Sequence, residues 1–516
     1  MRPTFLGFEA SKTALFASQK ALDITGNNLS NISSEGYTRQ RVDQISVGYQ
    51  DYATRGNMGV RVALAGQGTE ILGIGQTRDK QLDNAFRLQN SEIGETSQRS
   101  AIYSDIENAL QEFDIGSDGN GYGLRNAVSN LYNSLQNFSM DASSPTYAAV
   151  TADAFDKLAG SINDMYSNLE DVAEKYKSSL SDDCSAVNVS LEKIAGLNKD
   201  IREAMVANQY TQEYGPNELL DQRNALIDKI SSYAETSLKF NSDGTVDVSL
   251  GGHTAVSGEN ADALNYVENT DGTVDVYWKN SGENAGAGTG KIAAAVDVLN
   301  GRGTGVQSPT ESTDKGVLYY MDKLNKFAST IADVCNSTIP ETVDANGNPL
   351  TYKKLFGAAV ADKDGTYDVY NDMLITADNI SVSNELDNNA NYLLFNGGGN
   401  SDNTYLLNLT AKLSKSSFDF GEFKGTFEDY ITDYSTGLGK DISYNSEKNA
   451  AAVIVGKSLD ASRDSVIGVS ETEETTNMLS YNRAFQAASR MMTVMDDLLN
   501  VIINQMAVWF KDKRCY

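Results

Sequence analysis

Apolar residues recur every seven positions near the C-terminal end of the chain. One series is Met478, Phe485, Met492, Leu499 and Met506, and a second, offset by three, is Tyr481, Ala488, Met495, Ile502 and Trp509. Five heptads with apolar residues at both positions are typical of a helix that packs lengthwise against another helix. The pattern predicts a final helix over about residues 475–510. Periodicity alone leaves open that this is an ordinary amphipathic core helix.

A second seven-residue series lies near the N-terminal end. It consists of Phe8, Leu15, Leu22 and Leu29, and beside it lie Ala10, Ala14, Ala17 and Ala21. The alanines are small enough to let a partner helix approach closely. This pattern predicts a first helix over about residues 3–32, with Gly36 as its C-terminal cap. Two such helices at opposite ends of the chain predict a terminal helix pair, with everything else inserted between them.

Helical periodicity also dominates much of the chain between these ends. Apolar residues at spacings of three and four predict long helices from about residue 78 to 235, including a block over 145–210 and a new helix that begins at Pro216. Short strands are predicted earlier, around Val42–Val47 and Val60–Leu64, because apolar residues alternate there between glycines. The region therefore resembles a bundle of long helices preceded by a small β element.

The pattern changes after residue 235. The segment Asn241–Val248 is nearly repeated by Asn269–Val276, and residues 364–369 form a looser third copy. Asp-Gly followed by alternating valine and polar residues indicates a turn that leads into a strand. We expect mostly strands over 236–290 and a second β-rich stretch over about 345–420, with a helix over 317–339 between them. Helix is predicted again from about residue 430.

These elements predict an α+β protein with a coiled-coil-like pair of long terminal α-helices, an α-helical bundle domain and inserted β-rich outer regions. The expected domains are 1–40 with 465–516 (terminal, axial coiled coil), 41–235 with 290–340 and 421–464 (mainly helical), 236–289 (β-rich insertion) and 341–420 (β-rich outer domain).

The charge balance restricts the partners. The chain has 42 Lys and Arg against 70 Asp and Glu, a net charge of −28, which disfavours nucleic acid and anionic membranes as partners. No apolar run reaches membrane-spanning length, and the N-terminal segment lacks the pattern of a secretory signal. The three cysteines lie far apart in the sequence, so a disulfide framework is not expected.

Candidate chemistry is sparse. The single histidine, His253, has no second histidine or paired cysteine near it, so neither a metal site nor a catalytic triad is expected. Residues 285–292 resemble a phosphate-binding loop but carry Ala285 and Ile292 at two required positions. The Asp-Gly turns fail the ligand spacing of a calcium loop. We therefore expect no cofactor and no enzyme activity, although paired carboxylates of a glycosidase cannot be located or dismissed from sequence.

Both ends of the chain carry segments that resemble a known family. Residues 21–39 and 474–488 are similar to the terminal motifs of flagellar rod, hook and hook-associated proteins. The motif residues are Asn27, Asn28, Asn31, Gly36, Tyr37, Thr38 and Arg39. Arg39 after Gly-Tyr-Thr, and the segment 219–227, are closer to the hook-associated members than to rod or hook proteins. Residues 507–516 extend beyond the usual end of the family.

The resemblance implies a structural component of the bacterial flagellum at the hook–filament junction, secreted by type III export and assembled axially by its terminal helices. The expected assembly interface is Phe8, Leu15, Leu22, Leu29, Met478, Tyr481, Phe485, Met492, Met495, Leu499, Ile502 and Met506. The implied partners are further copies in a homo-oligomer, the hook protein, hook-associated protein 3 and a cytoplasmic export chaperone. The alternatives are the hook protein itself or another axial structural protein, a cell-wall hydrolase, and an adhesin built on residues 236–420.

Overall fold

The computed structural model describes residues 4–34, 36–46, 68–110, 123–208, 214–285, 288–305, 311–361, 367–371, 373–395, 403–415, 417–501 and 503. The chain forms two compact units. Unit 1 comprises Met1–Asn90, Asn188–Ala263 and Ile454–Tyr516, and unit 2 comprises Ser91–Val187 and Leu264–Val453. Among the described residues, no helix is both long enough and apolar enough to cross a membrane.

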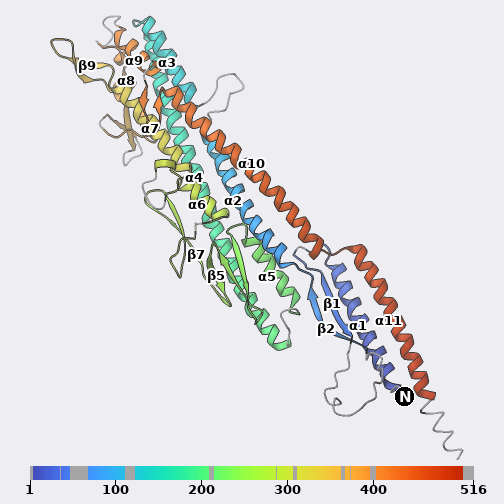
Figure 1. Ribbon diagram of the computed structural model, residues 1–516. Helices are drawn as coiled ribbons and strands as arrows, with labels where there is room; N and C mark the ends of the chain where they lie inside the picture. Colours follow the sequence, from blue (N-terminus) through green and yellow to red (C-terminus); the bar gives the residue numbers. More distant parts are fainter. Residues whose placement is uncertain are drawn as a thin grey trace, which may run out of the picture. The chain divides into compact units, whose positions relative to one another are not determined.

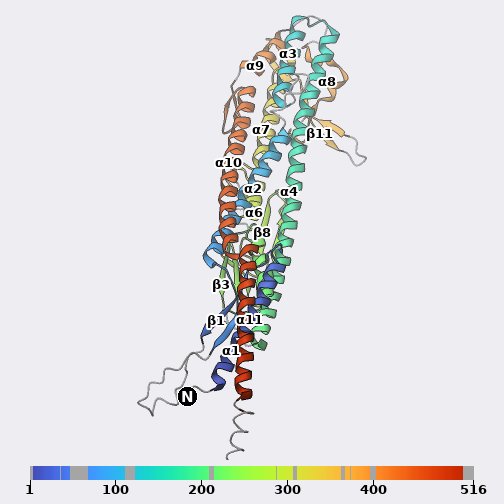
Figure 2. The same ribbon diagram turned by 90° about the vertical axis from the view of Figure 1, so that its right-hand side faces the viewer.

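The first and last helices of the chain pair with each other in unit 1. Helix α1 (Thr4–Ser30) and helix α11 (Glu471–Asn500) lie side by side in both views (Figure 1, Figure 2). The predicted terminal helix pair is therefore confirmed. Helix α11 begins earlier than the heptad pattern predicted, because Ser470 is its N-cap and its hydroxyl accepts a hydrogen bond from the Glu473 N–H.

A β-hairpin packs on α1. Its strands β1 (Gln40–Ser46) and β2 (Thr69–Gln76) are antiparallel. The sequence did not predict β2, and the expected strand at 60–64 lies outside the described residues. Glycines hide the strand pattern of β2, and one of them is needed by the packing. A Cβ atom on Gly73 would lie only 2.3 Å from the ring of Tyr214.

The rest of unit 1 contains helix α5 (Asn217–Ile230) and a four-stranded antiparallel sheet. The strands are β3 (Thr236–Phe240), β4 (Val246–Leu250), β5 (His253–Ser257) and β6 (Asn260–Ala261), in that order across the sheet. The boundary between the units falls within α2 (Lys80–Leu110), α4 (Pro145–Asn208) and α10 (Phe427–Ile467). The predicted helix over 145–210 is thus a single helix of 64 residues.

Unit 2 has its core around helix α7 (Val317–Asn336). Phe327 of α7 is fully buried, and its ring centroid lies 5.3 Å from that of Phe427 at the start of α10. The ring of Tyr430 stacks on Phe420 at 4.0 Å. Other elements of this unit are α3 (Leu124–Met140), β7 (Leu264–Glu268), β8 (Val274–Trp278), α6 (Lys291–Leu299) and the short helix η1 (Gly303–Gly305). These contacts form an aromatic-rich core.

The predicted β-rich stretch over 345–420 is correct only for its first half. Strands β9 (Pro340–Val343), β10 (Pro349–Tyr352), β11 (Phe356–Ala361), β12 (Tyr367–Tyr370) and β13 (Ile380–Val382) are followed by α8 (Asn384–Asn388), η2 (Ala390–Leu393), α9 (Thr404–Lys415), β14 (Phe418–Asp419) and β15 (Lys424–Gly425). The described residues 383–395 and 403–415 are therefore mainly helical. The side chains of Ser383 and Asn389 cap the first two helical segments, although such residues are also common in turns.

The near-repeat in the sequence is also a repeat in structure. Hairpins β3–β4 and β7–β8 share one register, in which Phe240 pairs with Val246 and Glu268 with Val274. An asparagine of α4 and the C-cap asparagine of α6 each bond both backbone groups of the first residue after a turn. Asn198 holds Val246 at 2.9 and 3.1 Å, and Asn300 holds Val274 at 2.7 and 2.8 Å. Each copy thus anchors one hairpin to one helix.

Candidate assembly site: the terminal helix pair and its polar clasp

The predicted heptad positions of α11 form its least exposed face. Met478, Tyr481, Phe485, Met492, Met495 and Leu499 are half-buried, and Ala488 between them is buried. This face is turned towards α1: a Cβ atom on Gly7 of α1 would lie 2.3 Å from the Met495 methyl carbon. Ile502 and Met506 lie outside the described residues whose side chains the structure places. The described heptad residues therefore cover α1 within the same chain.

On α1 the face is centred differently from the expectation. The buried series is Ser11, Ser18 and Thr25, with Ala14, Ala21 and Asn28 as the second series, of which Ala14 alone is half-buried. The predicted ridge of Phe8, Leu15, Leu22 and Leu29 flanks this seam and is half-buried. The reason is complementary size: long side chains of α11 fill the space above small residues of α1, so the helix axes can approach closely.

The hydroxyl groups in this seam are satisfied within α1. Ser11 donates to the Gly7 carbonyl at 2.8 Å, Ser18 to Ala14 at 2.8 Å and Thr25 to Ala21 at 2.9 Å. Such bonds to the carbonyl four residues back leave no buried hydroxyl without a partner. The seam is therefore polar in composition but saturated in hydrogen bonding.

A neighbouring face of α11, about one residue step (~100°) around the helix from the seam, carries a second apolar stripe that no described residue covers. Met491, Val494, Leu498 and Val501 are between 45 and 52% exposed and follow spacings of three and four. Ala484 and Ala487 continue the same series towards the N-terminal end of the helix. A contiguous exposed stripe with heptad spacing is typical of a surface that another helix covers.

Where α1 ends and α11 begins, residues from the terminal motif segments form a polar cluster, called the clasp here. It consists of Asn28, Tyr37, Arg39, Gln40 and Glu474. Asn28 is 1% exposed, and its amide is fully used. Its nitrogen donates to the Gln40 carbonyl at 2.9 Å and to Glu474 at 3.2 Å. Its oxygen accepts from the Tyr37 hydroxyl at 2.8 Å and the Gln40 N–H at 3.0 Å. One side chain thus joins the end of α1 to β1 and α11.

Arg39 links the clasp to the start of α11. Its guanidinium reaches Glu474 at 2.8 and 2.9 Å and Glu473 at 3.0 Å. Glu474 is 2% exposed, whereas the Glu473 side chain is 62% exposed. The backbone N–H of Arg39 also donates to the carbonyl of Ile467, which is the last residue of α10, at 2.9 Å. Both Arg39 nitrogens contact the same oxygen of Glu474, Oε1, and Asn28 donates to the other, Oε2. Charge-assisted bonds to a buried carboxylate in the first turn of a helix are strong.

Thr38 connects the clasp to α5. Its N–H donates to Asp221 at 3.2 Å, and its hydroxyl accepts from Arg78 at 3.2 Å. Burial raises the pKa of Asp221, against the lowering effect of its hydrogen bonds from Thr38 and Gln76 and of the charge on Arg78. Burial and then the neighbouring charge of Asp221 raise the pKa of Tyr37 to about 12, so its hydroxyl stays protonated as a donor.

The remaining motif residues lie at the end of α1 and just after it. Asn31 donates to the carbonyl and side-chain oxygens of Asn27 at 3.0 and 2.9 Å. Gly36 has φ of +77°, a backbone conformation that residues with a Cβ atom adopt rarely. The prediction that Gly36 caps α1 is wrong, because α1 ends at Ser30 and Gly36 lies in a later turn, where the Tyr37 N–H donates to the Ser34 carbonyl at 3.2 Å. That turn directs the chain into β1.

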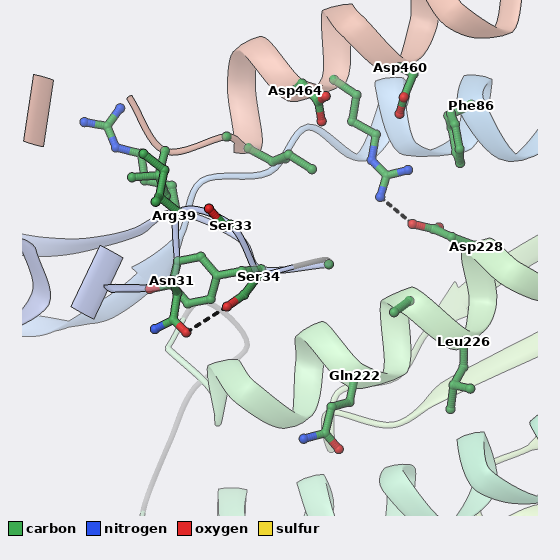
Figure 3. A pocket seen from close by; sticks show the side chains of 18 of the residues that line it. Asn31, Ser33, Ser34, Arg39, Phe86, Gln222, Leu226, Asp228, Asp460 and Asp464 are labelled. Atoms are coloured by element: carbon green, nitrogen blue, oxygen red, sulfur yellow. Dashed lines mark hydrogen bonds and ion pairs between the residues drawn. The ribbon is translucent and has the colours of Figure 1, made fainter. Parts of the chain in front are cut away.

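An ion-pair network lies next to the clasp in unit 1. Arg463 of α10 pairs with Asp83 at 3.1 Å and with Asp228 of α5, and Arg87 pairs with Asp228 at 2.7 Å. Figure 3 shows the Asp228 pair at a groove of about 1540 Å³ that Asn31, Ser34 and other motif residues also line. Acidic and basic side chains alternate around this groove, which favours no ligand of one charge sign.

Sequence reasoning missed several of these residues. Glu474 and Asp221 were noticed only as members of longer similar segments, and Arg87, Asp228 and Arg463 were not singled out. No local signal identifies them, because each finds its partner across a separation of more than 100 positions in the sequence.

The remaining candidates for chemistry stay isolated. His253 lies 3.1 Å from Asp262, and Cys184 and Cys335 are buried and unpaired. Burial raises the pKa of Cys184 to about 12, which makes its thiol unreactive. Among the described residues, no group of three or more His, Cys, Asp or Glu side chains is arranged to hold a metal ion.

The terminal helices of this chain form a pair with an exposed apolar stripe, and comparisons with known proteins identify similar proteins. Residues 8–38 match the flagella basal body rod protein family, and residues 465–506 match the flagellar basal body rod FlgEFG protein C-terminal family. Residues 106–356 match the flagellar hook-associated protein FlgK helical domain.

Individual relatives carry the same description. The chain is 27% identical to flagellar hook-associated protein 1 of Bacillus subtilis over 98% of this chain and 99% of the relative. It is 24% identical to the protein of that name from Salmonella typhimurium, over 65% of this chain and 57% of the relative. A solved structure of the flagellar hook junction protein FlgK from Burkholderia pseudomallei aligns at 20% identity and a TM-score of 0.40, covering 54% of this chain and 47% of that one.

Over nearly its whole length the chain is similar to members of the flagellar rod, hook and hook-associated protein family, as its terminal motifs predicted. Within this family the matches are to hook-associated proteins, and the helical-domain match over 106–356 covers most of unit 2 and residues 188–263 of unit 1. The family is one of flagellar structural proteins, which places this chain in the axial structure of the flagellum.

Proposed function

We propose that this chain is a non-catalytic subunit of the hook–filament junction, which assembles around the flagellar axis through its terminal helix pair after type III export. The observation that carries the proposal is the second apolar stripe of α11, with Met491, Val494, Leu498 and Val501 about half exposed. A monomer gains nothing from leaving such side chains in water, because burying each one contributes about 1.5–3 kcal/mol.

The partners follow from this role. Further copies of the chain cover the outer stripe of α11, and the half-buried ridge of Phe8, Leu15, Leu22 and Leu29 lies on the flank of the same pair. The hook protein and hook-associated protein 3 adjoin the junction, and a cytoplasmic chaperone protects the chain before export. The clasp supports this role because it fixes the start of α11 relative to α1.

The test is the double substitution Val494→Asp with Leu498→Asp in cells whose own copy of the gene is deleted. Two carboxylates on the stripe place unpaired charges in any helix–helix contact formed there, which costs several kcal/mol. We expect hooks without filaments, flagellin in the medium, and normal export of the variant measured by blotting. The matched control is Ser489→Asp with Thr493→Asp, which adds the same charge to exposed polar positions of α11 and should leave filaments intact.

Normal filaments in the Val494 and Leu498 variant would contradict the proposal. A strain that lacks the gene distinguishes the junction role from the main alternative, the hook protein. Loss of the hook would identify a hook protein, whereas complete hooks that shed flagellin identify a junction protein. Turnover of peptidoglycan by the purified chain would instead support the hydrolase alternative.

A further inference from the structure

A second cavity in unit 1 has a charge opposite to that of the protein. It has a volume of about 370 Å³ and lies among the N-terminal part of α2, the C-terminal part of α4, the start of α5 and the β3–β4 turn. Of the described residues that line it, the charged ones are Arg41, Arg78, Lys80, Arg87, Arg223 and one acid, Asp83. In a chain of net charge −28, five basic groups around one cavity form a local exception.

Arg223 of α5 is the least compensated of these groups. It is 3% exposed, and one of its terminal nitrogens donates to the Asn198 side chain at 2.9 Å and to the Gly244 carbonyl at 2.8 Å. Both acceptors are uncharged. Its Nε has no hydrogen-bond partner, and no described carboxylate forms an ion pair with it. A buried guanidinium without an anion is costly, since an unpaired buried charge destabilises a fold by several kcal/mol.

Arg87 of α2 adds a second incompletely paired group. It is 2% exposed, and its Nε lies 2.7 Å from Asp228, but one terminal nitrogen has no hydrogen-bond partner. Burial, and then the like charge of Arg87, lower the pKa of Arg223 to about 10. The two guanidinium groups therefore repel each other across a buried space, and both retain unused donors.

The other walls of the cavity suit a negative ligand. Gly215 and Asn217 line it at the N-terminal end of α5, where the N-cap residue Pro216 supplies no side-chain hydrogen bond. The positive end of the helix dipole therefore contributes to the same space. Lys80 is an exposed residue of the lining, with its ammonium 4.6 Å from the centre of the Phe240 ring. By contrast, Arg78 is neutralised by Asp83 at 2.9 Å.

We infer that this cavity binds a small oxyanion of the phosphate or sulfate class, with Arg223 and Arg87 as direct donors. Guanidinium groups present N–H donors in a fixed fork that matches such anions. The bound anion supplies the missing acceptors and offsets the repulsion, and so joins α2, α5 and the β3–β4 turn. A purely structural Arg223, held only by Asn198 and Gly244, explains neither the unused Nε nor the basic lining.

The experiment is calorimetric titration of the full chain with inorganic phosphate at constant ionic strength set by chloride, together with thermal unfolding at each concentration. We expect saturable binding and a rise in melting temperature with phosphate. Arg223→Met should weaken binding at least about tenfold, because it removes charge-assisted hydrogen bonds. Lys80→Met, at an exposed position, should weaken binding by about threefold, as expected for a more solvated charge.

Lys239→Met is the matched control. Lys239 lies on β3 next to the cavity, is 79% exposed and does not line it, so its loss changes the net charge equally without altering binding. If Arg223→Met fails to fold, Arg223→Lys and Lys80→Met decide instead, with weaker binding expected for both. No phosphate-dependent heat or stabilisation in the natural protein would overturn the inference, and so would folded variants that bind like the natural protein. Loss of phosphate binding with normal filament assembly would leave the proposed junction role intact.

Discussion

Helices α7 and α11 differ in how much of their apolar surface is buried within their own unit. In α7 of unit 2, 12 of 20 residues are buried, and the helix is surrounded by its own unit. In α11 of unit 1, the buried residues are only Glu474 and Ala488 in a helix of 30 residues. The difference indicates that α7 stabilises the core of a folded unit, whereas α11 leaves apolar side chains exposed, in line with the proposed assembly surface. A long helix with one covered face is only marginally stable by itself.

The comparison predicts its largest effect in the core of unit 2. Phe327→Ala removes a fully buried ring that contacts Phe427 and Tyr430, and it should lower the free energy of unfolding by about 3–5 kcal/mol. Equilibrium unfolding in urea measures this change. The control Leu498→Ala, at a position 49% exposed on α11, should change it by less than about 0.5 kcal/mol. Equal effects of the two substitutions would contradict the contrast between the helices.

The clasp should give the next largest effect. Glu474→Ala leaves Arg39 and Asn28 without their buried carboxylate partner, and it should destabilise the start of α11 by about 3 kcal/mol. Hydrogen exchange of the α11 amides measures this locally. Glu473→Ala provides the control on the same arginine, since its side chain is 62% exposed and its loss should cost less than about 1 kcal/mol. If both variants behave alike, burial of Glu474 is not what strengthens the clasp.

The small-residue seam of α1 should tolerate little extra volume. Ala21 is 2% exposed, so Ala21→Leu should separate the helices and destabilise the pair by about 1–3 kcal/mol through overpacking. The neighbouring Lys20 is exposed, and Lys20→Leu should have almost no effect on exchange in α11. A stabilised pair in the Ala21 variant would show that the leucine ridge, rather than the small-residue seam, faces α11.

The smallest effect is a difference in pH dependence between the units. In unit 2, partial burial raises the pKa of Asp105, but hydrogen bonds from Lys175 and Tyr176 lower it further than burial raises it, so the pKa lies below its ordinary value. Its stabilising contribution is therefore present above its unfolded pKa of about 3.9 and is lost as pH falls further. In unit 1, burial raises the pKa of Asp221, so its contribution is present at low pH and is lost as pH rises through the folded value.

Unfolding of Asp105→Asn and Asp221→Asn, compared with the natural chain between about pH 3 and pH 7, tests these opposite signs. Removing Asp105 should reduce the rise of stability with pH. Removing Asp221 should reduce the fall of stability with pH. Slopes of the same sign would mean that the two carboxyl groups do not differ in the way their surroundings indicate.

The fold could be predicted well where the sequence pattern was long and periodic. The α11 heptads and the helical spacing over 145–210 each contain many turns, so chance matches are few. The prediction failed where the residue types favour a loop or turn but tertiary contacts or caps hold the segment as a strand or helix. In strand β2, Gly73 leaves room for the ring of Tyr214. Residues 384–393 are rich in asparagine but form two helical segments with side-chain caps.

The α1 seam shows why the candidate site was only partly predictable. The leucine ridge of Phe8, Leu15, Leu22 and Leu29 is the more conspicuous series, yet the structure centres the contact on serines and alanines. Hydrophobicity indicates which faces avoid water. It does not indicate which face has the shape that a particular partner requires, because the fit depends on the side chains of both helices.

Local periodicity and contiguous motifs were enough to predict the terminal helix pair, the length of the central helices, the duplicated turns and the resemblance to the family. That Asn28 and Arg39 meet Glu474, that Thr38 meets Asp221, and that Arg223 is buried without a carboxylate could be seen only in the folded chain. These groups are far apart in the sequence, and the free energy of a buried polar group depends on partners that only folding brings within hydrogen-bonding distance.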